Sequence, residues 1–342
     1  MNNCRFQNVR LSDLSTYRTQ LMGIAALMII ICHANTYHVL LPNFLASMLR
    51  WGNLGVDIFL FLSGIGLYYS LNRRQLCTRS DYISFYKRRF TRILIPYWMV
   101  YLPACIFFMI MGMYSFGDSL LCLSTIEYWL FHRGAWFVSM ILVLYLAAPV
   151  LYKTLSTDNK WVIAAGIIVA LTILCNIPVN DHSSDSILYN MQWAFNRVPS
   201  FILGITIGSS CKNGKQIPPS QILLFSLSGI IMSVSIGVWK CLWLIIPTIL
   251  YFLIILIKLL ENTRIDNGLK FLGEISLESY LTNITLKLIL GALIPSYFSS
   301  PVFIGHYLDY AAVIVLGIFI AKKIHIISKK ITTDLFPVQT GK

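Results

Sequence analysis

Long apolar runs recur along the chain from residue 20 to residue 327, with only short polar segments between them. The hydrocarbon core of a bilayer is about 30 Å thick, so a helix needs about 20 apolar residues to cross it. Windows of this length predict ten spanning helices, at residues 20–41, 53–71, 93–114, 135–152, 161–178, 190–209, 221–238, 241–260, 270–293 and 307–327. The pattern predicts an all-α, polytopic membrane bundle that forms one transmembrane domain over residues 1–342.

Two of these windows leave alternatives open. The sixth contains Asn196, Arg197 and Pro199, which predicts a broken or half-buried helix that protein or water must cover. Windows seven and eight are separated by little more than Trp239 and Lys240. If they formed one long helix, the orientation of every later span would reverse.

Composition and charge place the chain in a bilayer, since 57% of residues are hydrophobic, 12% are charged and the formal charge is +13. With ten spans and the N-terminus inside, 22 of the 27 Lys and Arg residues fall on the cytoplasmic side. This asymmetry is the positive-inside pattern. It predicts a multi-pass protein of the cytoplasmic (inner) membrane, with cytoplasmic segments at residues 1–19 and 328–342, and it explains the basic composition without a nucleic-acid partner. The eight scattered cysteines have no metal-ligand spacing, so we expect no disulfide framework and no metal.

The first span carries His33 within its apolar run. An ionisable residue inside the membrane is costly to bury, and this points to a functional site. Counted from the ends of their spans, His33 and Asp57 fall at the same level of the outer half and can pair. The alternatives are a core histidine bonded to a carbonyl group, and an aspartate that caps the second helix.

Further polar or amphipathic side chains fall in the same layer by this count: Trp136, Ser139, Arg197, Asn283 and Lys287. Arg197 alternatively extends its guanidinium to the membrane surface. On the cytoplasmic side, the run FYKRRFTRILIPYW contains Arg88, Arg89 and Arg92. Their spacing predicts a clamp for a phosphorylated ligand if the helix has begun by then, with lipid-headgroup anchoring as the alternative.

Taken together, several stretches resemble integral-membrane acyltransferase family 3. They are MGIAALMIIICH, GVDIFLFLSGIGLYYSL, FYKRRFTRILIPYW, AWFVSMILVLYLAAPVLY, NRVPSFILGITIG and FLGEISLESYLTN. Their order and spacing along nearly the whole chain carry the resemblance. It implies an enzyme that transfers acyl groups, usually acetyl, from acyl-CoA to hydroxyls of cell-surface carbohydrates.

The resemblance also implies roles for individual residues. His33 becomes the essential histidine, the Arg88, Arg89 and Arg92 group becomes the basic motif, and Trp136, Arg197 and Ser279-Tyr280 are further family positions. In two places this sequence departs from the family pattern. Met22 stands where the family places an arginine, and Arg18, four residues earlier on the same helix face, is the expected substitute. Asn283 stands where many members carry a second histidine, so it can form hydrogen bonds but cannot shuttle protons.

From these residues we expect His33 to act as a general base and Asp57 to hold its ring. Arg197 or Asn283 would stabilise the oxyanion, Arg18, Arg88, Arg89 and Arg92 would bind acetyl-CoA, and Trp136 and Tyr280 would belong to the substrate site. Acetyl-CoA is a co-substrate, and we expect no permanently bound cofactor. The acceptor would be a lipopolysaccharide O-antigen, a capsule or exopolysaccharide unit, a lipid-linked intermediate or an antibiotic sugar. The enzyme would act on it directly or through a separate partner such as a glycan-assembly protein. The alternatives are a transporter or flippase of a polysaccharide precursor and a succinyl or other acyl donor.

Overall fold

The computed structural model describes residues 9–34, 42–179, 186–212, 243–294 and 305–336, together with residues 224, 227, 230 and 231. These residues form helices joined by short loops, and no β-strand lies among them, so the all-α prediction is confirmed for the described part of the chain. The first half contains α1 (Asp13–Thr16), α2 (Arg18–Cys32), α3 (Asn43–Arg50), the short 3₁₀ helix η2 (Trp51–Asn53), α4 (Leu54–Arg74), α5 (Arg79–Ile110), α6 (Phe116–Leu123), α7 (Glu127–Phe131) and α8 (Trp136–Thr154).

The second half contains α9 (Lys160–Asn176), α10 (Ile187–Phe195), α11 (Val198–Lys212), α13 (Ile246–Leu260), α14 (Arg264–Glu274), α15 (Ser276–Leu293) and α16 (Gly305–Leu335). Five stretches are long and apolar enough to cross a membrane: Asn43–Arg74, Arg79–Ile110, Trp136–Thr154, Trp243–Leu260 and Tyr307–Leu335. Arg18–Cys32 and Lys160–Asn176 are apolar but shorter. The protein is therefore a helical membrane protein, and ten spans remain a prediction.

Several predicted boundaries differ from the structure. The first span ends as a helix at Cys32, and residues 35–41 lie outside the described residues, as does nearly all of window 221–238. Window 270–293 is interrupted at Ile275, between α14 and α15. The predicted break in the sixth window is confirmed, because α10 ends at Phe195 and α11 begins at Val198.

Helix α5 begins at Arg79, well before the predicted start at residue 93, because a capping box starts it. The Thr78 hydroxyl accepts from the Asp81 backbone N–H at 3.3 Å, and the Asp81 carboxylate accepts from the Thr78 N–H at 2.7 Å. Two otherwise unpaired backbone donors are thereby satisfied. The early start places all three arginines of the basic motif within regular helix.

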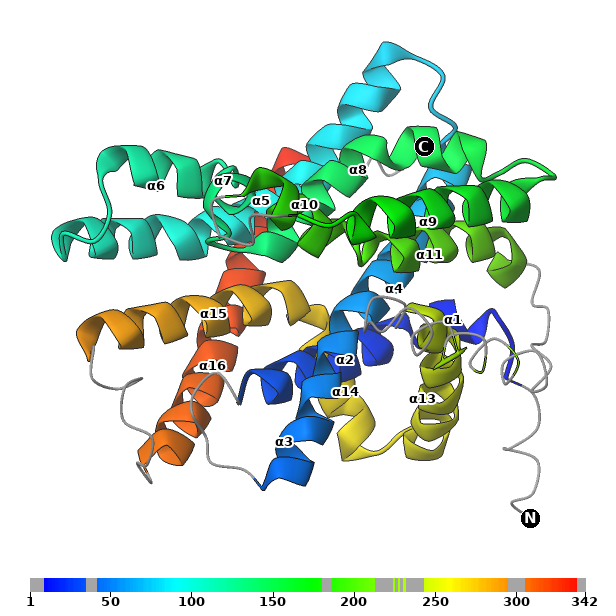
Figure 1. The fold of residues 1–342 in the computed structure, drawn as a ribbon. Helices are drawn as coiled ribbons and strands as arrows, with labels where there is room; N and C mark the ends of the chain where they lie inside the picture. The colour runs from blue at the N-terminus through cyan, green and yellow to red at the C-terminus, as the bar shows by residue number, and fades with distance from the viewer. Residues whose placement is uncertain are drawn as a thin grey trace.

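Helix α4 runs through the middle of the bundle, with α2 on one side and α11 on the other (Figure 1). Glycines allow this close approach. A Cβ at Gly204 would meet the Phe61 carbonyl oxygen, and a Cβ at Gly208 would meet the Tyr68 ring. Small residues at this spacing are typical of helix contacts within membranes, where backbone proximity replaces the hydrophobic driving force.

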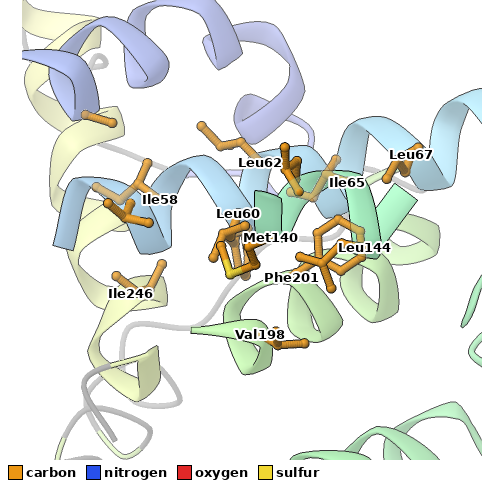
Figure 2. Packing of buried hydrophobic residues seen from close by; sticks show 14 of the residues in the cluster. Ile58, Leu60, Leu62, Ile65, Leu67, Met140, Leu144, Val198, Phe201 and Ile246 are labelled. Atoms are coloured by element: carbon orange, nitrogen blue, oxygen red, sulfur yellow. The ribbon is translucent and has the colours of Figure 1, made fainter. Parts of the chain in front are cut away.

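The core fills the space around α4. Figure 2 shows Leu60 of α4, Met140 of α8 and Phe201 of α11 within one apolar cluster, and each side chain is at most 1% exposed. A second close contact aligns α2 with the C-terminal helices, since a Cβ at Gly23 would meet the Leu269 backbone and one at Gly273 would meet Thr19. Helix α14 therefore lies against the first half of α2, and α15 also packs against α2.

Candidate active site

His33 lies at the C-terminal end of α2, where it caps the helix. It borders a small cavity that we call the His33 cavity, lined by Ala26, Ile29, Ile30, His33, Phe59, Ser276, Ser279, Tyr280 and Asn283. The residues from α2 recur at intervals of three and four, so they form a single face of that helix. The cavity volume is ≈ 10 Å³, which is room for about one water molecule.

Helix α15 supplies the polar wall of this cavity. Asn283 is held by its own helix, because its side-chain amide donates to the Ser279 carbonyl at 2.7 Å and to the Ser279 hydroxyl at 3.3 Å. The Tyr280 hydroxyl is buried, and no described residue forms a hydrogen bond with it. One turn beyond Asn283, Lys287 lies close enough to His33 for its charge to act on the imidazole. Histidine, amide, phenol and ammonium groups thus converge at one end of α2.

Asp57 lies at the same end of the bundle, in the first turn of α4, and only 1% of its side chain is exposed. Its carboxylate forms a short ion pair with Arg197 and accepts a hydrogen bond from the Ser200 hydroxyl at 2.9 Å. The break between α10 and α11 positions both partners. Arg197 lies in the turn between the two helices, and Ser200 lies in the first turn of α11.

These contacts revise two expectations for Asp57 and Arg197. The Asp57 carboxylate contacts Arg197 and Ser200 rather than His33, and its side chain does not cap α4. Arg197 binds the carboxylate and does not simply extend to the membrane surface. The sequence placed both groups in one layer but did not show that they pair with each other.

The opposite end of α2 holds a second group, which we call the arginine cluster: Arg18, Arg89 and Arg92. Arg18 donates from Nε to the Leu62 carbonyl at 3.3 Å, and it lies close enough to Arg89 and Arg92 for their charges to repel. The Arg89 guanidinium packs 5.9 Å from the Tyr145 ring centre. Among the described residues, no carboxylate forms an ion pair with any member of the cluster.

Arg88 belongs to the same basic motif, but its side chain projects from a different face of α5. Its guanidinium lies 5.9 Å from the ring centre of Phe336, at the end of α16. Arg89 and Arg92, three residues apart, are the members that face α2. Because fifteen residues separate Arg18 from His33 on one helix, the arginine cluster and the His33 cavity are roughly 22 Å apart.

A family model described as an acyltransferase domain matches residues 20–323 of the chain. The chain belongs to acyltransferase family 3. Searches of curated proteins and of solved structures each found no match. Family membership and the apolar helices together make this protein a membrane acyltransferase.

In this acyltransferase, Met22 stands where the family pattern has an arginine. Arg18 lies where a substitute for that arginine is expected. Met22 packs against the apolar core, whereas the Arg18 side chain reaches the basic motif on α5. The contact supports the interpretation of Arg18 as a member of the basic site.

Aromatic residues that sequence reasoning missed complete the surroundings of the His33 cavity. Phe59 lines the cavity, and Phe137 packs on both Phe59 and Tyr280, with ring centres 6.3 and 5.8 Å apart. Trp136 lies next to Phe137 and contacts Trp193 instead, at 4.9 Å. The helical period of α8 indicates that Trp136 and Phe137 point in different directions, but it does not indicate which of the two is nearer the cavity.

No three His, Cys, Asp or Glu side chains gather into a potential metal site within the described parts of the chain. The groups around the cavity are suited to proton transfer and to hydrogen bonding with a polar substrate. The arginine cluster is suited to binding an anion.

Proposed function

We propose that this acyltransferase transfers acetyl from acetyl-CoA to a hydroxyl of a cell-surface or lipid-linked carbohydrate, within the cytoplasmic (inner) membrane. The observation that carries the proposal is the placement of two chemically distinct groups on one helix. Arg18 begins α2 beside Arg89 and Arg92, and His33 ends it beside Tyr280 and Asn283. The first group suits the phosphates of a nucleotide donor, and the second suits acyl transfer.

In this proposal the donor binds from the cytoplasm with its phosphates on the arginine cluster. Guanidinium groups bind phosphate oxygens in a fork geometry, and three cations without a carboxylate partner leave that capacity free. The thioester arm then follows the face of α2 that carries Ala26, Ile29 and Ile30 toward His33. These side chains are apolar, as the uncharged arm of the donor requires.

At the other end, the neutral imidazole of His33 takes the proton of the acceptor hydroxyl as its oxygen attacks the thioester carbon. The carbon–sulfur bond breaks, and CoA leaves as the thiol after it receives that proton. Tyr280 is placed to donate a hydrogen bond to the developing oxyanion, and Asn283 lines the same cavity. Asp57 and Arg197 act as positioning residues, since the ion pair joins α4 to α11 beside the end of α2.

Asn283, which cannot accept and release a proton at neutral pH, leaves His33 as the single imidazole lining the cavity.

The test uses the purified protein in proteoliposomes with labelled acetyl-CoA and surface polysaccharide freed of its ester groups by mild base. We expect labelled acetyl to appear on the polysaccharide, and we expect His33→Gln to reduce the rate by about 10²-fold or more. His325→Gln is the matched control, because His325 contacts Glu278 on the far side of α15 at 3.0 Å. Full activity in a folded His33→Gln protein would refute the assignment, and movement of unmodified polysaccharide instead would indicate a transporter. Succinyl-CoA in place of acetyl-CoA tests the donor.

A further inference from the structure

A row of aromatic rings begins at the exposed surface of α10 and leads inward. Trp193, which is 39% exposed, packs edge-on against Trp136, with ring centres 4.9 Å apart and an angle of 85° between the rings. Trp193 also packs edge-on against His132 at 5.2 Å. The three rings come from α10, from the start of α8 and from the residue that ends α7, and these helices contact one another in the structure (Figure 1).

The row continues from Trp136 to the His33 cavity. Trp136 packs on Phe137 at 6.2 Å, and Phe137 packs on Phe59 and Tyr280, which both line the cavity. Successive rings therefore connect the surface at Trp193 with the wall of the site that holds His33. Edge-to-face packing is the preferred geometry of such ring pairs, so each ring fixes the orientation of the next.

His132 is held in place beside this row by a buried amide. Its Nδ1 lies 2.7 Å from Oδ1 of Asn190, which is completely buried and also donates from Nδ2 to the Trp129 carbonyl at 3.1 Å. The His132 backbone is left-handed, with φ of +53°, a conformation uncommon for residues other than glycine. No described residue forms a hydrogen bond with Nε2, so this nitrogen can meet a ligand.

We propose that Trp193, Trp136 and His132 form a sugar-binding subsite that takes a pyranose ring of the acceptor and directs its hydroxyl toward the His33 cavity. A pyranose has an apolar face of C–H groups and a rim of hydroxyls. The Trp193 ring offers an apolar surface to the first, and His132 offers a hydrogen-bonding nitrogen to the second. None of these three side chains is acidic, as suits a neutral ring.

This inference rests on the proposed function, because it identifies the part of the acceptor that the same site recognises. It assigns donor and acceptor to different walls of the protein, with the arginine cluster for the nucleotide and the aromatic row for the sugar. The two substrates should therefore respond to different substitutions.

The experiment measures acetyl transfer in proteoliposomes, with de-esterified surface polysaccharide and acetyl-CoA varied independently. We expect Trp193→Ala to raise the KM for polysaccharide about tenfold, which corresponds to the loss of one well-packed aromatic contact. The KM for acetyl-CoA should not change. Trp193→Phe should recover most of the loss, and Trp161→Ala, which removes a similarly exposed ring on α9, should have no effect.

The experiment distinguishes an error in the proposed function from an error in the sugar subsite alone. If the wild-type protein transfers no acetyl to polysaccharide, the proposed function is wrong. If transfer is normal but Trp193→Ala leaves the KM for polysaccharide unchanged, the sugar subsite alone is wrong. A parallel rise in both KM values would also overturn the subsite, because it would show that Trp193 supports the fold rather than the acceptor.

Discussion

The two ends of α2 hold polar groups under opposite conditions. At the Arg18 end, like charges from α2 and α5 face one another, and no described carboxylate pairs with them. Beside the His33 end, Asp57 and Arg197 neutralise each other, and Ser200 fills a further hydrogen-bonding position of the carboxylate. The positive charge of the arginine cluster is therefore not balanced by a described carboxylate, whereas the Asp57 carboxylate already has its counter-charge and a hydrogen bond.

The difference indicates different tasks. Like charges repel, so the arginine cluster gains stability when an anion enters, and such a site suits a substrate that arrives and leaves. A buried, fully paired carboxylate gains nothing from a ligand but holds its helices in a fixed relation. Under the proposed function, binding of a mobile substrate and positioning of fixed groups are therefore separated along one helix.

The largest expected effect comes from breaking the buried pair. Asp57→Ala leaves the partly buried Arg197 without its counter-charge. Removal of one partner of a buried ion pair destabilises a protein by roughly 3–5 kcal/mol. We expect a large fall in the melting temperature in detergent, with loss of acyl transfer. Asp158→Ala removes an exposed carboxylate and should change stability by no more than about 0.5 kcal/mol. Equal stability of the two variants would show that the two ends of α2 do not differ as described.

A substitution in the arginine cluster should have a smaller effect, which is limited to the KM of one substrate. Arg89→Gln removes a charge that can bind a donor phosphate, a contact worth roughly 1.5–3 kcal/mol. The KM for acetyl-CoA should therefore rise about 10- to 100-fold with little change in the KM for polysaccharide. Added salt should weaken donor binding less in this variant than in the wild type. Arg79→Gln, on the first residue of α5, serves as the control, and an equal response there would contradict the clamp.

The smallest effect concerns a carboxylate near the Arg18 end that is already paired. Asp266 on α14 accepts from Lys270 at 2.8 Å and from Gln20 of α2 at 3.2 Å, and the hydrogen bond from Lys270 holds the pKa of Asp266 below its usual range. A lowered pKa in the folded state contributes stability above the unfolded pKa of about 3.9, and this contribution is lost as pH falls through the folded value.

Asp266→Asn should therefore lower the melting temperature slightly at pH 7, and the difference from the wild type should shrink below about pH 4. The KM for acetyl-CoA should stay the same, because Asp266 is bound to Lys270 and does not neutralise the arginine cluster. A pronounced change in that KM would show that the cluster has an acidic partner after all.

The shared level of residues on neighbouring helices was predictable from sequence, but the direction of side chains was not. Counting residues from the ends of the apolar runs placed His33 and Asp57 at one level, and α2 and α4 do meet near there, since a Cβ at Gly55 would contact Ala25 and Ile29. Which side chains face each other depends on the rotation of each helix, and packing sets that rotation. The pairing of Asp57 with Arg197 follows from the contact between α4 and α11.

Short sequence features predicted the structure correctly where the structure depends on only a few neighbouring residues. The polar run with Pro199 marked the break between α10 and α11, which the structure confirms. The position of Arg18 four residues before Met22 suggested a shared basic site with α5, and the two helices do bring Arg18 near Arg92. Convergence of Tyr280 and Asn283 on His33 required the alignment of α15 along α2, which no short motif encodes.

The position of His33 as the residue that ends α2 has an electrostatic consequence. Aligned peptide dipoles give a helix a partial positive charge at its N-terminus and a partial negative charge at its C-terminus. The N-terminus of α2, at Arg18, therefore adds to the attraction for a donor anion. In the proposed mechanism, the C-terminus faces an imidazole that becomes a cation, and it favours that cation by up to about 2 kcal/mol in a partly buried setting. The backbone of α2 thus favours the expected charge at each end before any side chain contributes.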